Sequence, residues 1–173
     1  EDGTCMGVVT FNVPGVYNFD SSIGFQAQLG MVGSITVDAF TLLDLMLSWN
    51  GDESAPSAWQ STYAMQYSCP SCAEALTGIE EYTVFLPNDD AIAALGDLMN
   101  LNQFDMLAIP DFQDILEYHI VEGIYLADVL EPGMSLPTLL GEDAIVGQGA
   151  GGGLTIDGAN IVETNYTADN GVV

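Results

Sequence analysis

No lysine or arginine occurs in this chain of 173 residues, whereas aspartate and glutamate together account for 25. The formal net charge is therefore −25 at pH 7, and ordinary salt bridges cannot neutralise the carboxylates. Solvent cations or partners must offset this charge, because at about 0.15 M salt a Debye length of about 8 Å only softens the repulsion between two copies. Nucleic acids, acidic membranes and anionic substrates are disfavoured as partners, since their recognition depends on cationic side chains.

The apolar content of the chain is nevertheless that of a globular protein. Hydrophobic residues make up 49% of the sequence and the mean hydropathy is +0.29, which is enough for one core of ordinary size. No apolar run approaches the roughly 20 residues of a membrane-spanning helix. Because the first residue is Glu1 and not methionine, we expect a processed, secreted chain that is extracellular or at the cell surface. The N-Y-T sequence at Asn165 is a candidate glycosylation site.

Three cysteines, Cys5, Cys69 and Cys72, are the candidates for disulfide formation. Because their number is odd, one thiol is left over if a single intrachain bond forms. A structural disulfide between Cys5 and one of the other two is favoured, with a local bond within C-P-S-C or a bond between chains as the alternative. The C-P-S-C spacing is also that of thiol redox sites, but no tryptophan precedes it and no βαβ pattern surrounds it. Three cysteines and one distant histidine are a weak match for zinc.

The first half of the sequence changes from a strand pattern to a helical pattern. Residues 1–36 are expected to form strands and turns, and residues 37–49 a mostly buried helix, because apolar residues recur there at helical spacing. Residues 50–72 show no period, so we expect an inserted loop that leads into a short helix at 73–77. A β-branched and aromatic strand follows at 82–86.

Two further helices are predicted from their caps and spacing. One has Asn88 or Asp89 as its cap and an acidic first turn. The other follows Asp111, is predicted to end at Gly123, and places His119 on its apolar face, where we expect the imidazole to bond to backbone and organise the core. Short strands are expected from Ile124 onward, at residues 124–130, 135–140, 142–147, 153–158 and 159–166 and in the final N-G-V-V.

Several patterns in the sequence resemble catalytic or binding motifs, but none matches such a motif fully. G-Q-G-A-G-G at residues 147–152 has the spacing of a nucleotide-binding loop, but strand-like residues follow it, so a hairpin connection is predicted. The acidic clusters lack the D-x-[DN]-x-[DN]-G pattern, so we expect no cofactor beyond loosely bound Ca²⁺. Among 25 acidic residues any carboxylate pair could be proposed, and no spacing nominates a catalytic residue. We therefore expect no enzymatic activity.

Two blocks of sequence, in the same order, resemble the fasciclin (FAS1) family. T-V-F-L-P-N-D-D-A-I at residues 83–92 is similar to the first block of the family, and Y-H-I-V-E-G at residues 118–123 is similar to the second. The resemblance implies an α+β fold over residues 35–173, a β-sandwich or wedge with several short helices. Residues 50–72 would then be a cysteine-bearing insertion, and residues 1–34 an N-terminal β extension or donor arm.

The resemblance also implies a function. It indicates a secreted, non-enzymatic adhesion or structural protein whose partners include cell-surface or matrix proteins or glycans. In some animal members the Tyr-His pair is associated with integrin contact, which makes Tyr118 and His119 the adhesion candidates of this chain. A thiol redox protein or a calcium-dependent cell-surface protein is the alternative.

Family members continue with one more strand after the equivalent of N-G-V-V, whereas this sequence ends at Val173. We therefore expect the last sheet strand to be missing from the chain and the backbone beside Val172 to be unpaired. Strand addition from another copy could fill this edge and build a homo-oligomer or filament, with Cys5 locking the joint, or the chain's own arm could return to it. The donor-strand candidates are Gly7, Val8, Val9, Thr10, Phe11, Asn12 and Val13.

Overall fold

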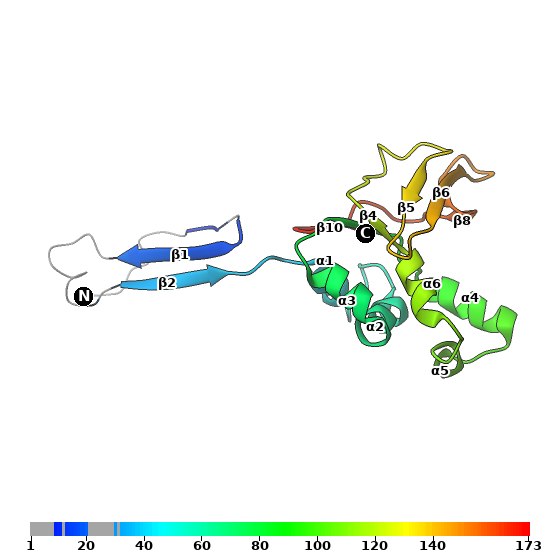
Figure 1. Ribbon diagram of the computed structural model, residues 1–173, viewed down its shortest axis with the longest axis horizontal. Helices are drawn as coiled ribbons and strands as arrows, with labels where there is room; N and C mark the ends of the chain where they lie inside the picture. Colours follow the sequence, from blue (N-terminus) through cyan, green and yellow to red (C-terminus); the bar gives the residue numbers. More distant parts are fainter. Residues whose placement is uncertain (1–8, 12, 21–29, 31) are drawn as a thin grey trace. The chain divides into compact units, whose positions relative to one another are not determined.

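The computed structural model describes residues 9–11, 13–20, 30 and 32–173, and the chain divides into two units. The first unit is Glu1–Ala39 and the second is Phe40–Val173. The division thus lies after Ala39, whereas the sequence places it between residues 34 and 35. Figure 1 shows the helices and strands of each unit in chain order.

The first unit contains an antiparallel hairpin of β1 (Gly15–Asp20) and β2 (Val32–Val37). Its register pairs Tyr17 with Ile35, and the strand character predicted for residues 1–36 is confirmed by these two elements. Of the donor-strand candidates, Val9, Thr10, Phe11 and Val13 lie outside both strands. The other three, Gly7, Val8 and Asn12, fall outside the described residues.

Helix α1 (Leu42–Ser48) begins the second unit where a buried helix is predicted. Thr41 and Asp44 form a capping box, in which the side chain of each residue accepts a hydrogen bond from the backbone N–H of the other, at 3.3 and 3.0 Å. Its buried residues are Leu42, Leu43 and Met46.

The sequence predicts a loop for residues 50–72, but these residues contain helix α2 (Trp59–Ser68), and α3 follows at Pro70–Thr77. The prediction is wrong because two of the four buried residues of α2 are hydroxyl residues, which interrupt its apolar stripe. Ser61 Oγ donates to the carbonyl of Pro87 at 2.7 Å, and Thr62 Oγ1 donates to that of Ala58 at 2.9 Å. Buried hydroxyls satisfied in this way leave no helical period in the hydrophobic pattern.

The start of α2 also lacks a local cap. Ala58 at the N-cap offers no polar side chain, and the carboxylate of Asp89, at the start of the next long helix, takes its place. Asp89 accepts from the backbone N–H of Gln60 at 3.0 Å and from the hydroxyl of Ser57 at 2.7 Å. Because the cap comes from a distant part of the chain, no local sequence signal marks the beginning of α2.

The two helices predicted from their caps are present as α4 (Asp89–Met99) and α6 (Phe112–Tyr118), with α5 (Gln103–Met106) between them. The side-chain oxygen of Asn88 accepts from the backbone N–H of Ala91 at 2.8 Å, which confirms the predicted cap of α4. Asp111 stands at the N-cap of α6 with a φ of 60°, but its side chain makes no cap hydrogen bond. The predicted end of this helix at Gly123 is wrong, because residues 120–122 leave the helix and pair with residues 82–84 as strands.

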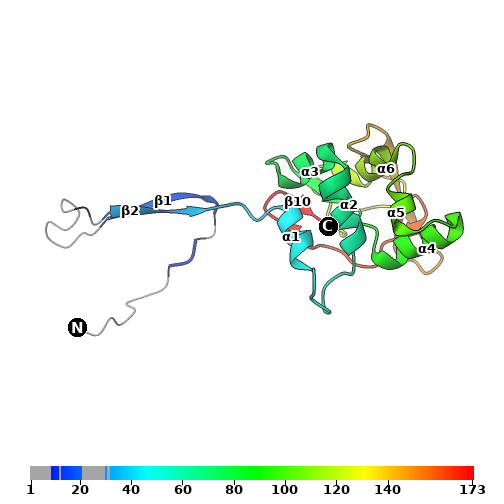
Figure 2. The same ribbon diagram turned by 90° about the horizontal axis from the view of Figure 1, so that it is seen from below.

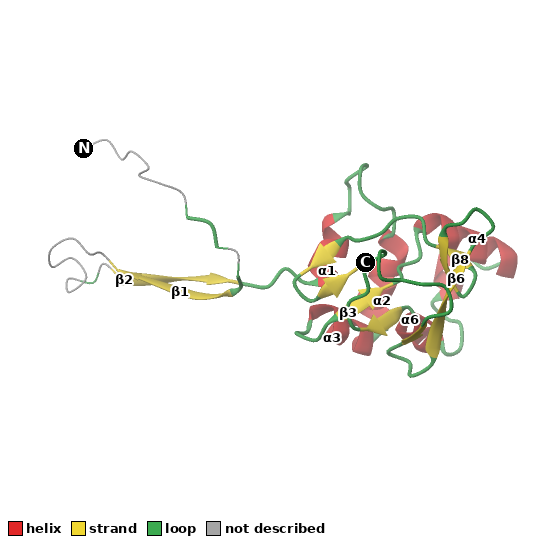
Figure 3. Cartoon of the chain, turned by 90° about the horizontal axis from the view of Figure 1, so that it is seen from above, coloured by secondary structure: helices red, strands yellow, loops and turns green. Residues whose placement is uncertain are grey.

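Two four-stranded sheets form the strand side of the second unit, in the orders β4-β3-β10-β9 and β5-β6-β7-β8. Figure 3 shows these strands on one side of the unit and the helices on the other. The predicted hairpin connection at residues 147–152 is confirmed, because β6 and β7 pair antiparallel across it. The bounds are β3 (Tyr82–Val84), β4 (Ile120–Glu122), β5 (Ser135–Pro137), β6 (Asp143–Gln148), β7 (Leu154–Ile156), β8 (Ala159–Asn160), β9 (Thr167–Ala168) and β10 (Gly171–Val172).

The backbone beside Val172 is not an open edge. β10 pairs in parallel with β3 on one side and antiparallel with β9 on the other. Val173 and Tyr166 also exchange two backbone hydrogen bonds, of 2.8 and 3.0 Å. The predicted unpaired edge is therefore wrong, and the reason is β9, a strand of two residues that is too short to show an alternating pattern.

Residues 124–130 form a loop with a turn, in place of the predicted strand. Their backbone N–H groups bond to side chains: Tyr125 donates to Thr83 Oγ1 at 2.8 Å, and Ala127 donates to Asn165 Oδ1 at 2.9 Å. Side-chain oxygens thus accept the backbone hydrogen bonds that a neighbouring strand would accept if these residues formed a strand. Within the predicted strand at 159–166, only β8 is regular.

The buried core of the second unit has two parts that meet at β4. Helix α2 packs against α1, α3, α4 and α6 (Figure 2). Ile120 belongs to the part among the helices and Val121 to the part among the strands, because successive side chains of β4 point to opposite faces. The first part includes Leu42, Met65, Leu76 and Val84, and the second includes Leu130, Leu136 and Val146.

Asn170, in the turn between β9 and β10, is a buried polar residue that connects three parts of this unit. Its Oδ1 accepts from the backbone N–H of Leu42, at the start of α1, at 2.7 Å. Its Nδ2 donates to the carbonyls of Leu76 and Gly78, at the end of α3, at 3.2 and 3.0 Å. Its backbone carbonyl accepts from Tyr82 N–H at 3.1 Å. One side chain therefore satisfies backbone groups at the start of one helix and at the end of another.

Replacing Asn170 by aspartate should lower the free energy of unfolding by at least about 3 kcal/mol. The carbonyl oxygens of Leu76 and Gly78 would lose their hydrogen-bond donor and would face a buried negative charge. Denaturant titration followed by circular dichroism measures this change. The control variant Asn160→Asp adds the same charge at an exposed position of β8 and should change the free energy by less than about 0.5 kcal/mol. Similar losses in both variants would contradict the role given to Asn170.

Candidate functional site

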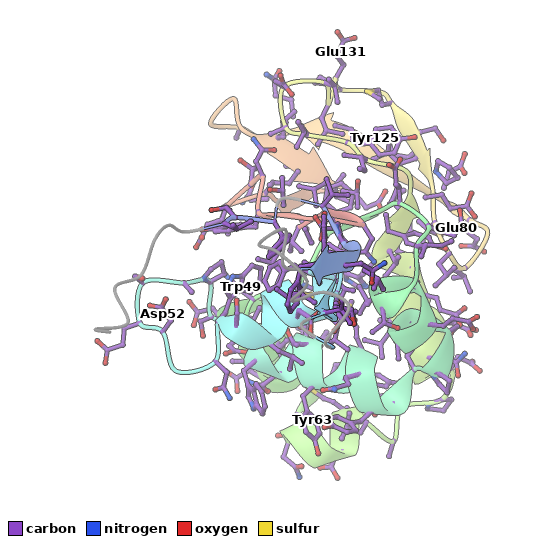
Figure 4. The ribbon with its side chains drawn as sticks, turned by 90° about the vertical axis from the view of Figure 1, so that its left-hand side faces the viewer. Trp49, Asp52, Tyr63, Glu80, Tyr125 and Glu131 are labelled. Atoms are coloured by element: carbon purple, nitrogen blue, oxygen red, sulfur yellow. A yellow bond between two sulfur atoms is a disulfide. The ribbon has the colours of Figure 1, made fainter. Side chains whose placement is uncertain are left out.

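A largely apolar groove lies within the second unit, between its helices and its strand side. Its volume is about 1210 Å³, which is above the roughly 300–1,000 Å³ usual for small-molecule sites. Tyr63 on the helical side and Tyr125 on the strand side both line it, and Figure 4 shows them well separated. Other apolar residues of its wall are Leu95, Phe112, Ile115, Ile156 and Ile161.

The polar side chains of the groove wall are largely occupied by the protein itself. Thr83 Oγ1 donates to the carbonyl of Gly123 at 2.7 Å, and Ser61 and Asn88 make the bonds described above. Within the part of the chain that the structure describes, no buried side-chain nitrogen or oxygen lacks a hydrogen-bond partner. The groove therefore offers apolar surface with few free directional contacts.

The adhesion candidate Tyr118 lies at the end of α6 and lines this groove. Its hydroxyl donates to Asp157 Oδ2 at 2.9 Å and lies 3.2 Å from the carbonyl of Asp143. Burial raises the pKa of Tyr118, and the hydrogen bond and negative charge of Asp157 raise it further. Because Asp157 Oδ1 also accepts from Ile145 N–H at 3.1 Å, Tyr118 ties α6 to the second sheet.

The other adhesion candidate, His119, is half-buried beside Tyr118 and also lines the groove. Its Nδ1 lies 2.7 Å from the carbonyl of Ile115, and since a carbonyl only accepts, Nδ1 carries the hydrogen. Burial lowers the pKa of His119, although the hydrogen bond to Ile115 acts in the opposite direction. The ring is therefore held neutral near pH 7, as a backbone-bonded part of the groove wall.

The cysteine pair lies at the start of α3, where Cys69 and Cys72 form a disulfide with their Cα atoms 5.2 Å apart. The local bond is thus the pairing present, and neither sulfur remains for the favoured bond to Cys5, which lies outside the described residues. Both residues are fully buried, which disfavours the thiol redox alternative because exchange needs an accessible sulfur. Ser71 between them donates to Glu117, linking α3 to α6.

Two other expectations concern glycosylation and metals. Asn165 is exposed, and its Oδ1 accepts from Ala127 N–H, so glycosylation there stays a prediction. Across residues 9–11, 13–20, 30 and 32–173, the structure has no group of three or more His, Cys, Asp or Glu side chains placed to hold a metal ion. Loose Ca²⁺ binding likewise stays a prediction.

Sequence reasoning places Tyr118 and His119 next to each other, but it misses the groove that they line. The helical wall contributed by α2 is absent from a prediction that makes residues 50–72 a loop. The available signal is the spacing of Trp59 and Tyr63, four residues apart, which would put both rings on one face of a helix.

Because the pKa of His119 is lowered on folding, the unfolded chain takes up its proton first as the pH falls below about 6.5. The free energy of unfolding should therefore lose a His119 contribution between about pH 7 and 5, at no more than about 1.4 kcal/mol per pH unit. The variant His119→Asn keeps a donor for Ile115 and cannot titrate. Denaturant titrations at several pH values should show the difference between the two proteins narrowing toward pH 5; a constant difference would contradict a neutral His119.

Comparison with known proteins identifies the family of the chain. The family model of the fasciclin domain matches residues 61–173. Protein sll1483 of Synechocystis sp. (strain ATCC 27184 / PCC 6803 / Kazusa) is 30% identical over an alignment of 117 residues, and the match covers 65% of this chain and 62% of that protein. The chain thus spans less than two thirds of the length of this curated relative.

These comparisons agree with the structure. The α+β fold with short helices, expected from residues 83–92 and 118–123, is confirmed. Among the described residues, every helix is too short or too polar to cross a membrane. Fasciclin domains are typically extracellular or surface modules for adhesion and protein interaction, and they are generally non-enzymatic. Because the family model covers more than half of its residues, the chain belongs to the fasciclin family.

Proposed function

We propose that this protein is a non-enzymatic adhesion protein of the extracellular space or cell surface, and that it holds an uncharged apolar group in the groove of its second unit. The observation that carries the proposal is the groove itself, about 1210 Å³ in volume and lined mainly by apolar side chains. Burial of apolar surface contributes about 25 cal/mol for each Å², so a filled groove gives binding without directional contacts.

The charges of the chain support an uncharged occupant. The ionised side chains on the groove wall are carboxylates, those of Asp90, Asp157 and Glu163. Because the chain has no lysine or arginine and its one histidine is held neutral, no cationic side chain is present to receive an anionic head group. Fatty-acid or phosphate groups would therefore be repelled, whereas a neutral apolar group pays no such electrostatic penalty.

The groove can be tested with the neutral dye N-phenyl-1-naphthylamine and the anionic dye 1-anilinonaphthalene-8-sulfonate. Fluorescence titration should show saturable binding of the neutral dye and much weaker binding of the anionic one. Leu95→Gln should lower the affinity for the neutral dye about fivefold, because Leu95 lines the groove and the substitution removes apolar contact with the dye.

The matched control is Leu98→Gln, on the same helix but 84% exposed and not on the groove wall. This variant should bind the dye like the unmodified protein. Absence of neutral dye binding, or equal binding by the two leucine variants, would reject the groove as the binding site.

Self-association is a second candidate function, and the β1–β2 hairpin favours it. Its register gathers Tyr17, Phe19, Ile35 and Val37 on one face. The opposite face is more polar and contains Asn18, Ser34 and Thr36 beside Val16 and Val32. Phe19 is 54% exposed, and none of the described side chains of this hairpin is buried. A two-stranded hairpin without a core is marginally stable alone, so a partner on its apolar face would stabilise it.

The hairpin is also the part of the sequence where two copies can approach at least electrostatic cost. Residues 3–37 contain one acidic residue, Asp20, whereas residues 40–173 contain 21. We propose that the apolar faces of two hairpins pack together and form a homo-oligomer, with further addition at the open strand edges giving a filament. This arrangement replaces the donor strand of residues 7–13 as the joint between copies.

Sedimentation velocity at 0.05 and 0.5 M NaCl tests this association, which should strengthen with salt because salt screens the acidic units. Ile35→Glu places a charge on the apolar face and should abolish the oligomer. Ser34→Glu adds the same charge to the opposite face and should leave it intact. A monomer at both salt concentrations, or equal loss in both variants, would reject the hairpin as the joint.

A further inference from the structure

The exposed face of α2 carries a row of aromatic side chains at intervals of four residues. Trp59, Tyr63 and Tyr67 are 45%, 45% and 65% exposed. Their rings are neighbours, with centroids 5.6 Å apart for Trp59 and Tyr63 and 4.5 Å apart for Tyr63 and Tyr67. A helical rise of about 1.5 Å per residue spreads the three over about 12 Å. These three residues are named the α2 ridge.

The α2 ridge does not serve the packing of its own helix. The buried residues of α2 are Ser61, Thr62, Ala64 and Met65. Large aromatic side chains usually supply core or interface contacts, yet here Met65 and three smaller residues face the core and the aromatic ones face outward. Since the helix is anchored by its small residues and by Asp89, the exposed rings remain available for an external contact.

The segment that carries the ridge is itself uncharged and rich in hydrogen-bonding groups, although the carboxylate of Asp89 lies at the start of α2. Residues 54–73 contain no charged side chain, in a chain with 25 carboxylates. Gln66 is a neighbour of Tyr63 on the helix surface, because it lies three residues after it. In the described part of the chain, the hydroxyls of Tyr63 and Tyr67 and the amide of Gln66 bond to no protein group.

We infer that the α2 ridge binds an uncharged polysaccharide. Aromatic rings stack on the apolar C–H faces of sugar rings, and a row of rings about 12 Å long matches a short run of sugars. The free hydroxyls and the amide can bond to sugar hydroxyls at the rim of such a contact. The neutral composition of residues 54–73 suits a ligand that brings no charge of its own.

The charge of the chain decides between this ligand and two other occupants. An anionic polysaccharide would meet a protein of net charge −25 without one basic residue. A second copy docked on α2 would bring together two units that each contain 21 acidic residues in residues 40–173. Both are opposed by repulsion that an uncharged polysaccharide does not encounter.

Affinity electrophoresis in native gels tests the inference with a matched pair of polymers, uncharged hydroxyethylcellulose and anionic carboxymethylcellulose. The full chain migrates fast because of its charge, and hydroxyethylcellulose should retard it at least fivefold more strongly than carboxymethylcellulose does. Tyr67→Ala should weaken the retardation about fivefold, through the loss of one stacked ring. Phe40→Ala, at a position that is 47% exposed and outside α2, should leave it unchanged.

Tyr67 separates this inference from the proposed groove, because Trp59 and Tyr63 line the groove but Tyr67 does not. Tyr67→Ala should therefore bind the neutral dye normally while losing retardation by hydroxyethylcellulose. The inference is overturned if neither polymer retards the chain, if carboxymethylcellulose retards it equally, or if Tyr67→Ala has no effect. A change in the sedimentation of Tyr67→Ala alone would also overturn it, since the ridge would then join two copies.

Discussion

The side-chain amide of Asn170 is the contact on which the second unit depends. This side chain accepts from the first backbone N–H of α1 and donates to two carbonyls at the end of α3. The backbone carbonyl of the same residue accepts from Tyr82 N–H and so holds β3 beside β10. The next residue, Gly171, brings the backbone so close that a Cβ there would lie 2.0 Å from the carbonyl oxygen of Tyr82. The pair Asn170-Gly171 has the sequence of a tight turn, but it also connects two helices to the central strands of a sheet.

The carboxylates of this chain act as hydrogen-bond acceptors where other proteins use ion pairs. Asp44 closes the capping box of α1, Asp89 caps α2 from a distance, and Asp157 joins Tyr118 to the second sheet. Hydrogen bonds from Thr41 lower the pKa of Asp44, and those from Ser71 and Gln113 lower the pKa of Glu117. Such groups stabilise the fold above their unfolded pKa, and the contribution is lost as the pH falls through the folded value. The fold is therefore compatible with its charge because many acids have structural partners.

Sequence reasoning succeeds where the cause of a structure is local. The cap at Asn88, the helix that begins after Asp111, and the glycine-rich connection between β6 and β7 follow from neighbouring residues. It fails where the cause is distant, as for α2, whose cap comes from another helix and whose buried face includes two hydroxyl residues. It fails again beside Val172, because a strand of two residues has no period. Tyr118 and His119 are found by sequence, but the groove around them requires the missed helix.

The large net negative charge of the chain has a mechanical consequence. With 21 of 25 acidic residues in residues 40–173, each second unit retains a cloud of small mobile cations around it. When many copies are held close together, these ions cannot leave, and their osmotic pressure draws water in between. A layer of this protein would behave as a swollen polyelectrolyte gel, stiff against compression in fresh water and thinner in brine.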